Sequence, residues 1–445
     1  MLAGVKEDRA QEPHIVIVGG GFGGLRAARE LGGSPVRVTL IDRRNHHLFQ
    51  PLLYQVATAG LSPADIATPI RGILHRQENT EVLLAELSAV DVRAREVVVN
   101  EVIGFNRRIR YDYLVLATGA THGYFGNEQW AKFAPGLKSV IDATQIRRKI
   151  LLAFEAAESE PDPVKRKELL TFIIVGAGPT GVELAGALYE LSHVALASDF
   201  RHINPKSARI LLIEAGPRIL AAFSEQSARK ARKKLESSSV EVRTGSRVRN
   251  VDAQGVVVGS EFIAARTVLW AAGVVASPAA RWLGVQADEA GRVKVGPDLT
   301  IADHPEIFVI GDTSTLEQDG TRLPGVAPVA LQQGKYVAKI IDGEIAGRVR
   351  PSSRPAFRYR DKGNLATVGR AYAVVEFKRL RETGFFAWIL WLLVHIYYLI
   401  GFRNRLVVLL EWAWAYLTFQ RGARLIISDR PELASEAESE EASTG

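Results

Sequence analysis

The chain has 445 residues, enough for two or three domains, and its 47% hydrophobic and 24% charged residues are typical of a folded globular protein. Its net charge of +7 favours an anionic partner, but no DNA- or RNA-binding motif accompanies it. We therefore expect a phosphate-rich cofactor or an anionic membrane surface, and no nucleic acid. Cysteine is absent, which excludes disulfides, thiolate metal sites, iron–sulfur clusters and thiol-based redox catalysis, and no metal site is expected.

A first nucleotide-binding unit is predicted after a charged N-terminus that lacks the apolar core of a secretory signal. Residues 15–18 form an apolar strand, a turn with G-x-G-x-x-G spacing follows, and the next strand ends in an acid. Such glycines allow a tight bend and a close approach to a pyrophosphate, while the acid accepts from a ribose hydroxyl. The predicted contacts are Gly19, Gly21, Gly24 and Asp42.

A second unit repeats this pattern from residue 170 onwards, after a predicted helix over 139–158 and a polar linker. Its predicted contacts are Gly176, Gly178, Gly181 and Glu214. An acid at the ribose repels a 2′-phosphate, so we expect NADH, although Arg209 and Arg218 nearby leave NADPH as an alternative. Two dinucleotides in one chain indicate a flavin enzyme, with FAD in one unit and nicotinamide in the other.

The C-terminal composition changes abruptly to apolar residues. Residues 385–402 contain only His395 as a polar side chain, a length at the lower edge of a membrane span, and a second apolar segment covers 406–419. Trp391 and Tyr397 lie six residues apart, about 9 Å on a helix, too close to mark two membrane interfaces. We therefore expect a monotopic helical hairpin, with a single transmembrane helix over about 385–402 as the alternative. The acidic tail at 430–445 is expected to be disordered.

Several motifs resemble the type II NADH dehydrogenases, the non-proton-pumping NADH:quinone oxidoreductases of the two-dinucleotide-binding-domain flavoprotein superfamily. The matching stretches are HHLFQPLLYQVATAGLSP (46–63), LVLATGA (114–120), GAGPTGVELAG (176–186), VLWAAGV (268–274), IFVIGDTS (307–314), APVALQQGKYVA (327–338) and KGNLATVGR (362–370). The resemblance implies an α/β fold with two Rossmann-like domains and a C-terminal membrane-associating helical segment. The implied domains are 13–150 and 291–350 for FAD, 168–290 for NADH and 356–425 for the membrane.

The resemblance also implies roles for single residues. Further FAD contacts fall on Gln55, Thr118, Gly119 and Asp312, and a further NADH contact on Gly273. Glu183 corresponds to an acid near the nicotinamide and flavin, although an acid favoured by the helix dipole is the alternative. Gln332 corresponds to the second of two quinone-site glutamines, whereas the first is replaced by Pro328. Lys362 would stabilise a reduced flavin or quinone anion, unless it is a plain surface lysine.

The function implied is NADH oxidation through FAD and two-electron reduction of a membrane quinone in a respiratory chain. We expect the enzyme at the cytoplasmic face of a bacterial membrane, in contact with lipid, and the monomer and the homodimer are both left open. The sequence does not specify the quinone. A soluble NADH-dependent ferredoxin or rubredoxin reductase is the alternative enzyme, and a flavin-bound redox sensor the non-enzymatic one. Because the nucleotide motifs precede the apolar segment, we expect a chain ending near Lys378 to keep FAD and leave the membrane.

Overall fold

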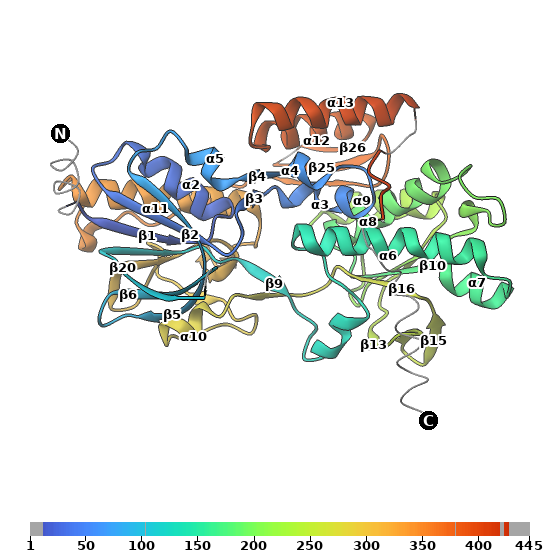
Figure 1. Cartoon of the computed structure of the whole chain (residues 1–445), viewed down its shortest axis with the longest axis horizontal. Helices are drawn as coiled ribbons and strands as arrows, with labels where there is room; N and C mark the ends of the chain where they lie inside the picture. Colours follow the sequence, from blue (N-terminus) through green and yellow to red (C-terminus); the bar gives the residue numbers. More distant parts are fainter. Residues whose placement is uncertain (1–11, 103, 379, 419–421, 427–445) are drawn as a thin grey trace. The chain divides into compact units, whose positions relative to one another are not determined.

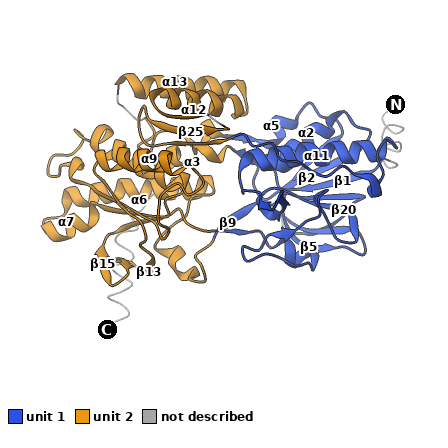
Figure 2. Ribbon diagram, turned by 180° about the vertical axis from the view of Figure 1, so that it is seen from behind, with its two compact units in different colours: residues 1–48, 67–122, 274–362 blue, residues 49–66, 123–273, 363–445 orange. Residues whose placement is uncertain are grey.

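The computed structural model describes residues 12–102, 104–378, 380–418 and 422–426, so the expected disordered tail lies outside the described residues. The chain forms two compact units (Figure 2): residues 1–48, 67–122 and 274–362 make the first, and residues 49–66, 123–273 and 363–445 the second. These divisions differ from the domain boundaries expected from the sequence. In particular, residues 49–66, expected in the FAD domain, pack their helices on elements of the second unit.

The first unit is built on an eight-stranded sheet with the order β19-β20-β8-β1-β2-β5-β6-β7 (Figure 1). Its strands are β1 (His14–Val18), β2 (Arg37–Asp42), β5 (Thr80–Asp91), β6 (Glu96–Glu101), β7 (Asn106–Arg110), β8 (Tyr113–Leu116), β19 (Thr300–Ile301) and β20 (His304–Val309). The five strands from β20 to β5 are parallel. All five residues of β1 are buried, as expected for a central strand of a parallel sheet covered on both faces.

Helices α2 (Phe22–Glu30) and α11 (Ala327–Ile345) pack against each other in the first unit. Their close approach depends on glycine, because a Cβ at Gly334 would lie 2.2 Å from the Gly23 carbonyl oxygen. The remaining elements of this unit are shorter. They are η1 (Leu31–Gly33), β3 (His46–Leu48), β4 (Ala67–Pro69), α5 (Ile70–Leu74), β9 (Ala120–His122), β17 (Val274–Ala276), α10 (Ala279–Leu283), β18 (Val293–Lys294), η6 (Gly311–Thr313), β21 (Ser314–Thr315), β22 (Glu317–Gln318), β23 (Thr321–Arg322) and η7 (Pro351–Ser353).

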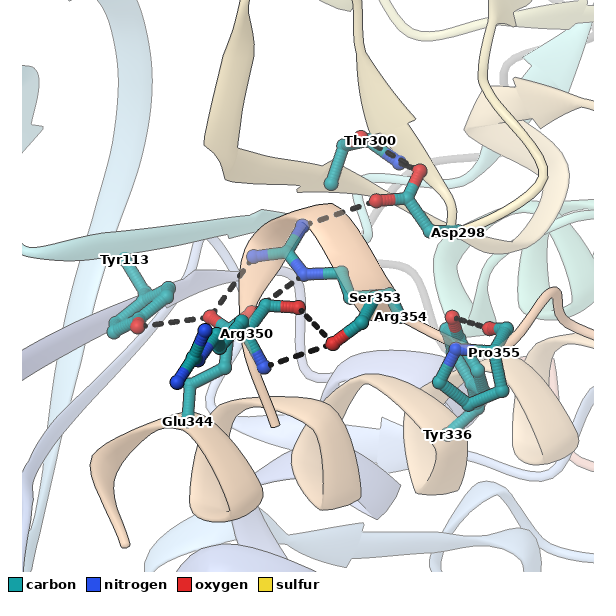
Figure 3. Close-up of polar contacts among 9 residues, drawn as sticks. All are labelled: Tyr113, Asp298, Thr300, Tyr336, Glu344, Arg350, Ser353, Arg354 and Pro355. Atoms are coloured by element: carbon teal, nitrogen blue, oxygen red, sulfur yellow. Dashed lines mark hydrogen bonds and ion pairs between the residues drawn. The ribbon is translucent and has the colours of Figure 1, made fainter. Parts of the chain in front are cut away.

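A buried ion-pair network fixes the end of α11 to the sheet (Figure 3). Arg354 donates through Nε and Nη2 to the two carboxylate oxygens of Glu344 at 2.7 and 2.9 Å, and through Nη1 to Asp298 at 3.1 Å. Its guanidinium lies 4.9 Å from the Phe308 ring centroid, and the Tyr113 hydroxyl donates to Glu344 at 3.0 Å. A buried charge is tolerated when it is paired in this bidentate way.

The second unit contains a four-stranded parallel sheet with the order β12-β11-β10-β16. The strands are β10 (Thr171–Val175), β11 (Arg209–Ile213), β12 (Val240–Arg243) and β16 (Thr267–Trp270), with an antiparallel meander of β13 (Val248–Val251), β14 (Gly255–Val258) and β15 (Glu261–Ala264). The helices are η2 (Gln50–Leu52), α3 (Leu53–Ala57), α4 (Pro63–Ile66), η3 (Glu128–Lys132), α6 (Val140–Ser159), α7 (Pro163–Leu169), α8 (Pro179–Glu190), the π-helical η4 (Leu191–Ala195), η5 (Pro205–Ser207) and α9 (Glu225–Ser237). The predicted helix over 139–158 is α6, which begins with a capping box of Ser139 and Asp142.

The C-terminal region forms a three-stranded antiparallel sheet followed by two helices. These are β24 (Asn364–Thr367), β25 (Ala373–Phe377), β26 (Leu380–Gly384), α12 (Phe385–Tyr398) and α13 (Phe402–Thr418). The alternative of one transmembrane helix over 385–402 is wrong, because α12 ends at Tyr398 and the chain turns at Gly401, whose φ is +91°. Within the described part of the chain, no helix has both the length and the apolar run needed to cross a bilayer.

Candidate functional site

The first glycine turn joins β1 to α2 in the first unit. Gly19 has a φ of +107°, and a Cβ there would lie 2.2 Å from the Ala117 carbonyl oxygen. A Cβ at Gly24 would lie 1.9 Å from the Gly19 oxygen, so the strand and the helix meet only because both residues are glycine. Gly21 is the N-cap of α2 and has open space around its Cα. A phosphate can therefore reach the unpaired N–H groups of the helix.

The acid of the first unit is bound to the glycine turn itself. Asp42, at the end of β2, is buried; its Oδ2 accepts from the Gly20 backbone N–H at 2.6 Å and its Oδ1 from Arg44 N–H at 2.7 Å. The carboxylate is thus held at the carboxyl edge of the sheet. Each oxygen keeps a second lone pair with which to accept from a ribose hydroxyl.

The remaining predicted FAD contacts of this unit lie on two neighbouring strand ends. Thr118 and Gly119 follow β8, and the Gly119 N–H donates to Thr313 Oγ1 at 2.7 Å. Asp312 lies beside Thr313 in the short helix η6, which follows β20. The sequence analysis missed Gln333, whose buried Oε1 accepts from the Gly311 N–H at 2.7 Å and so holds η6 in place. Its position next to Gln332 in α11 was the only signal for it.

The second glycine turn repeats this geometry between β10 and α8. Gly176 has a φ of +99°, and a Cβ there would lie 2.7 Å from the Ala272 nitrogen. A Cβ at Gly181 would lie 1.9 Å from the Gly176 oxygen, whereas Gly178, the N-cap of α8, has open space. Glu214 follows β11 and accepts from Ala177 N–H at 2.8 Å and Gly216 N–H at 2.7 Å. It therefore occupies in this unit the place that Asp42 occupies in the first.

Glu183 lies on α8, close after the second turn, and its side chain is buried. The sequence analysis also offered a simpler explanation, that Glu183 is an acid favoured by the helix dipole in the first turn. This explanation does not apply, because the first turn of α8 contains no acid. Burial raises the pKa of Glu183 to about 8, opposed only by the Thr367 N–H, which donates to Oε1 at 3.4 Å. The group is therefore a neutral carboxylic acid at neutral pH, able to give up a proton.

Glu183 faces a pocket that lies entirely within the second unit. The pocket is a half-open hollow, and the space between its walls, including open solvent at its mouth, is about 870 Å³. Four of its walls are aromatic side chains from the C-terminal helices. The lining residues are Tyr54, Gln55, Thr58, Gly60, Glu183, Ala187, Glu190, Val194, Ala195, Thr367, Gly369, Arg370, Trp388, Trp391, Leu392, Trp412, Ala415 and Tyr416.

A chain of hydrogen bonds links three elements across this pocket. The Tyr54 hydroxyl lies 3.0 Å from Thr367 Oγ1, and Gln55 Nε2 donates to the same hydroxyl at 3.0 Å. Trp412 Nε1 donates to Gln55 Oε1 at 2.8 Å, which joins α13 to α3. Burial and the neighbouring Glu183 raise the pKa of Tyr54, so its hydroxyl stays protonated. Both ends of the Gln55 amide are engaged here, and its predicted FAD contact stays a prediction.

Two predicted quinone-site residues belong to the first unit. Gln332 forms a paired contact with the backbone of Arg360, whose N–H donates to Oε1 at 3.0 Å and whose carbonyl accepts from Nε2 at 2.9 Å. Pro328 lies in the first turn of α11, where its missing N–H costs no hydrogen bond. Lys362 is exposed at the end of the unit. Roles for Gln332 and Lys362 at a quinone stay predictions.

The sequence analysis assigned no role in a binding site to Tyr54, Thr367, Trp391 or Trp412. Tyr54 and Thr367 were quoted within motifs but given no role, and they meet only through folding, 313 positions apart in the chain. Trp391 is fully buried, and its Nε1 has no hydrogen-bond partner among the described residues. His395 stacks on Trp391 with ring centroids 4.0 Å apart, and burial lowers its pKa to about 4. His395 is therefore neutral at physiological pH, and its Nδ1 lies 2.7 Å from the Trp391 carbonyl oxygen.

Comparison with known proteins shows which family the chain resembles over its whole length. The family description "Pyridine nucleotide-disulphide oxidoreductase" matches residues 13–334, and "NDH2 C-terminal domain" matches residues 362–421. The chain is 43% identical to the type II NADH:quinone oxidoreductase Ndh of Mycobacterium tuberculosis, covering 98% of both chains. It is 30% identical to an internal alternative NAD(P)H-ubiquinone oxidoreductase of Arabidopsis thaliana, over 94% of this chain and 86% of the relative. The structure of NDH2 from Plasmodium falciparum in complex with NADH has the same fold, with a TM-score of 0.84 at 21% identity over 94% of this chain and all of that one.

Proposed function

The chain belongs to the type II NADH:quinone oxidoreductases, and from this premise we propose how its two units divide the reaction. The enzyme oxidises NADH through FAD and reduces a quinone by two electrons without pumping protons. The balanced reaction converts NADH, one proton and a quinone into NAD⁺ and a quinol. We assign FAD to the first unit and NADH to the second. The observation that carries this assignment is the repeated glycine turn with its buried acid, Asp42 in one unit and Glu214 in the other.

Both turns fit the dinucleotides assigned to them. Side chains cannot replace Gly19 and Gly24, or Gly176 and Gly181, without overlapping backbone atoms, and the N-caps of α2 and α8 stay open to a pyrophosphate. The chemistry that FAD supplies when bound is to accept a hydride and to pass on electrons. The protein binds and orients the reactants and tunes their electrostatic environment.

We assign the quinone headgroup to the pocket of the second unit. A quinone needs apolar walls for its ring, polar groups for its two carbonyl oxygens and a source of protons. The walls come from Trp388, Trp391 and Trp412, and the polar groups from Tyr54 and Glu183. Because Glu183 is protonated at neutral pH, it can donate one of the two protons that quinol formation consumes.

The outer surface of α12 and α13 supports attachment to a membrane as a monotopic protein. Six large apolar residues on these helices are between 61% and 82% exposed: Phe386, Leu393, Tyr397, Phe402, Leu410 and Leu417. Such a surface is costly in water and is stabilised when it inserts into the lipid interface. The exposed Arg403 and Arg405, in the first turn of α13, suit anionic headgroups of a cytoplasmic leaflet. A soluble reductase of ferredoxin or rubredoxin has no use for this surface.

Steady-state oxidation of NADH with two alternative acceptors tests the proposal. The protein purified from membranes should show a flavin spectrum and oxidise NADH rapidly with a short-chain quinone but not with ferredoxin or rubredoxin. Faster turnover with either carrier protein would favour the soluble reductase, and a flavin spectrum without NADH turnover would favour a redox sensor.

A further inference from the structure

An unusual turn lies beside the predicted NADH-binding edge of the second unit. The backbone N–H of Asn127 donates to the Tyr124 carbonyl at 3.1 Å and closes a four-residue turn. The two central residues are left-handed, with φ of +54° at Phe125 and +85° at Gly126. Two positive φ angles in a closed turn are the mark of type I′, which favours Asn, Asp or Gly at both positions. Phe125 is therefore in a conformation that phenylalanine rarely adopts.

Packing of the side chain does not explain this choice, because Phe125 is 73% exposed. Its neighbours show the opposite behaviour: Tyr124, Trp130 and Trp270 are buried and pack on one another, and Trp270 Nε1 donates to the Gly123 carbonyl at 3.0 Å. The aromatic cluster thus fixes the backbone of the turn, whereas the Phe125 ring touches only Trp270 of this cluster, with ring centroids 6.3 Å apart, and stays mostly exposed. An unfavourable conformation whose side chain gains so little burial points to a functional role.

The position of the ring indicates what that role is. A Cβ at Gly273 would lie 2.9 Å from Phe125 Cζ, so the ring lies against the backbone that follows β16. The same segment contacts the glycine turn, since a Cβ at Gly176 would lie 2.7 Å from Ala272 N. Phe125 is therefore at the carboxyl edge of the parallel sheet, where dinucleotides bind.

The strand order decides which half of the dinucleotide meets the ring. The glycine turn follows β10, which lies between β11 and β16. Glu214 follows β11 and is assigned to the adenosine ribose, so the adenosine half extends over β11. The nicotinamide half then extends in the other direction, over β16, towards Gly273 and Phe125.

We propose that Phe125 is a positioning residue for NADH, an aromatic wall against which the nicotinamide half of the dinucleotide packs. The inference rests on the proposed function, because it takes NADH to be the ligand of the second unit. The left-handed turn presents the ring at the sheet edge, and Gly273 leaves room for it. An exposed aromatic ring is suited to contact a planar nicotinamide or the sugar beside it.

The test uses substitutions that separate NADH binding from folding. Phe125→Asn places a favoured residue in the turn, so its melting temperature should equal or exceed that of the wild type. Its KM for NADH, with ferricyanide as acceptor, should rise by about five- to tenfold, the loss expected for one aromatic contact. Phe125→Tyr keeps the ring and should keep the wild-type KM. Phe262→Ala, which removes a half-exposed phenylalanine from β15, is the control and should change neither quantity.

Inhibition by ADP-ribose, which lacks nicotinamide, identifies the half that the ring contacts. Its inhibition constant should be the same in Phe125→Asn and the wild type. Equal weakening of NADH and ADP-ribose, or an unchanged KM for NADH in Phe125→Asn, would overturn the inference. Failure of the proposed function is a separate result, because then the wild-type protein itself would not oxidise NADH.

Discussion

Single carboxyl groups are used in two opposite ways in this protein. Asp42 and Glu214 accept backbone N–H groups at the glycine turns, which hold their carboxylates in place. Burial raises the pKa of Glu183 to about 8, opposed only by one long hydrogen bond from the Thr367 N–H, so this group keeps its proton. Two of these acids are thus bound to glycine turns, as suits contact with a ribose, whereas burial keeps the third protonated.

Glu183 should make the stability of the protein depend on pH. Its pKa is about 8 in the folded protein but near 4.5 in an unfolded chain, so between these values the unfolded state binds fewer protons. The contribution of this group to the free energy of unfolding is therefore fully present below about pH 4.5 and falls, by a few kcal/mol, as the pH rises to about 8. Glu183→Gln should be relatively more stable at alkaline pH. Urea unfolding across this range, with the exposed Glu225→Gln as control, measures the effect; parallel profiles for Glu183→Gln and wild type would contradict it.

Glu214 should determine the preference for NADH over NADPH. Its carboxylate repels a 2′-phosphate, so Glu214→Gln should narrow the ratio of kcat/KM for the two cofactors by about tenfold, the scale of one charged contact. Glu241→Gln, which removes an acid paired with Arg209 on the neighbouring strand, serves as the matched control. An unchanged ratio in Glu214→Gln would show that another group reads the ribose.

The regular elements could be predicted from the sequence because their signals are local. The strands β1 and β10 and both glycine turns follow from apolar runs and glycine spacing, and the helix α6 agrees with the helix predicted over 139–158. The pocket could not be predicted, because its walls come from α3, α8, β24, α12 and α13. Their contacts depend on tertiary packing, as for Tyr54 and Thr367. A chain ending near Lys378 would lose β26 and the tryptophans of the pocket, while its retention of FAD stays a prediction.

Neighbouring glutamines on α11 should have different effects. Gln333 accepts a hydrogen bond from the Gly311 N–H and so holds the short helix η6, which contains Asp312. Gln333→Ala should therefore weaken the retention of FAD, measured as flavin absorbance after gel filtration. Gln332 is paired with the exposed backbone of Arg360, which water can solvate after substitution. If it also contacts quinone, Gln332→Ala should slow only the quinone-dependent step in stopped-flow measurements. If Gln332→Ala slows only the reduction of the flavin by NADH, then Gln332 does not contact the quinone.

At the scale of the whole molecule, the exposed apolar face of α12 and α13 should decide where the protein resides. A variant that combines Phe386→Ser, Leu393→Ser, Leu410→Ser and Leu417→Ser should partition at least about a hundredfold less to membranes, because each side chain adds apolar area to the lipid contact. NADH oxidation with ferricyanide should persist. Ile141→Ser and Val164→Ser, at exposed positions of α6 and α7, form the control. Release of the unaltered protein by high salt alone would show that the attachment is electrostatic rather than apolar.

The central claim is that quinone is reduced in the pocket that contains Glu183, and filling this pocket tests it most directly. Ala415 lines the pocket from α13, beside Trp412 and Tyr416, and Ala415→Trp adds bulk without charge. The measurement is the ratio of NADH oxidation with a short-chain quinone to that with ferricyanide. We predict that this ratio falls by at least about tenfold while the rate with ferricyanide is retained. The reason is that the added indole occupies space assigned to the quinone ring, and the lost contacts of that ring weaken binding by about this factor. A variant that reduces the quinone at the wild-type ratio would contradict the account.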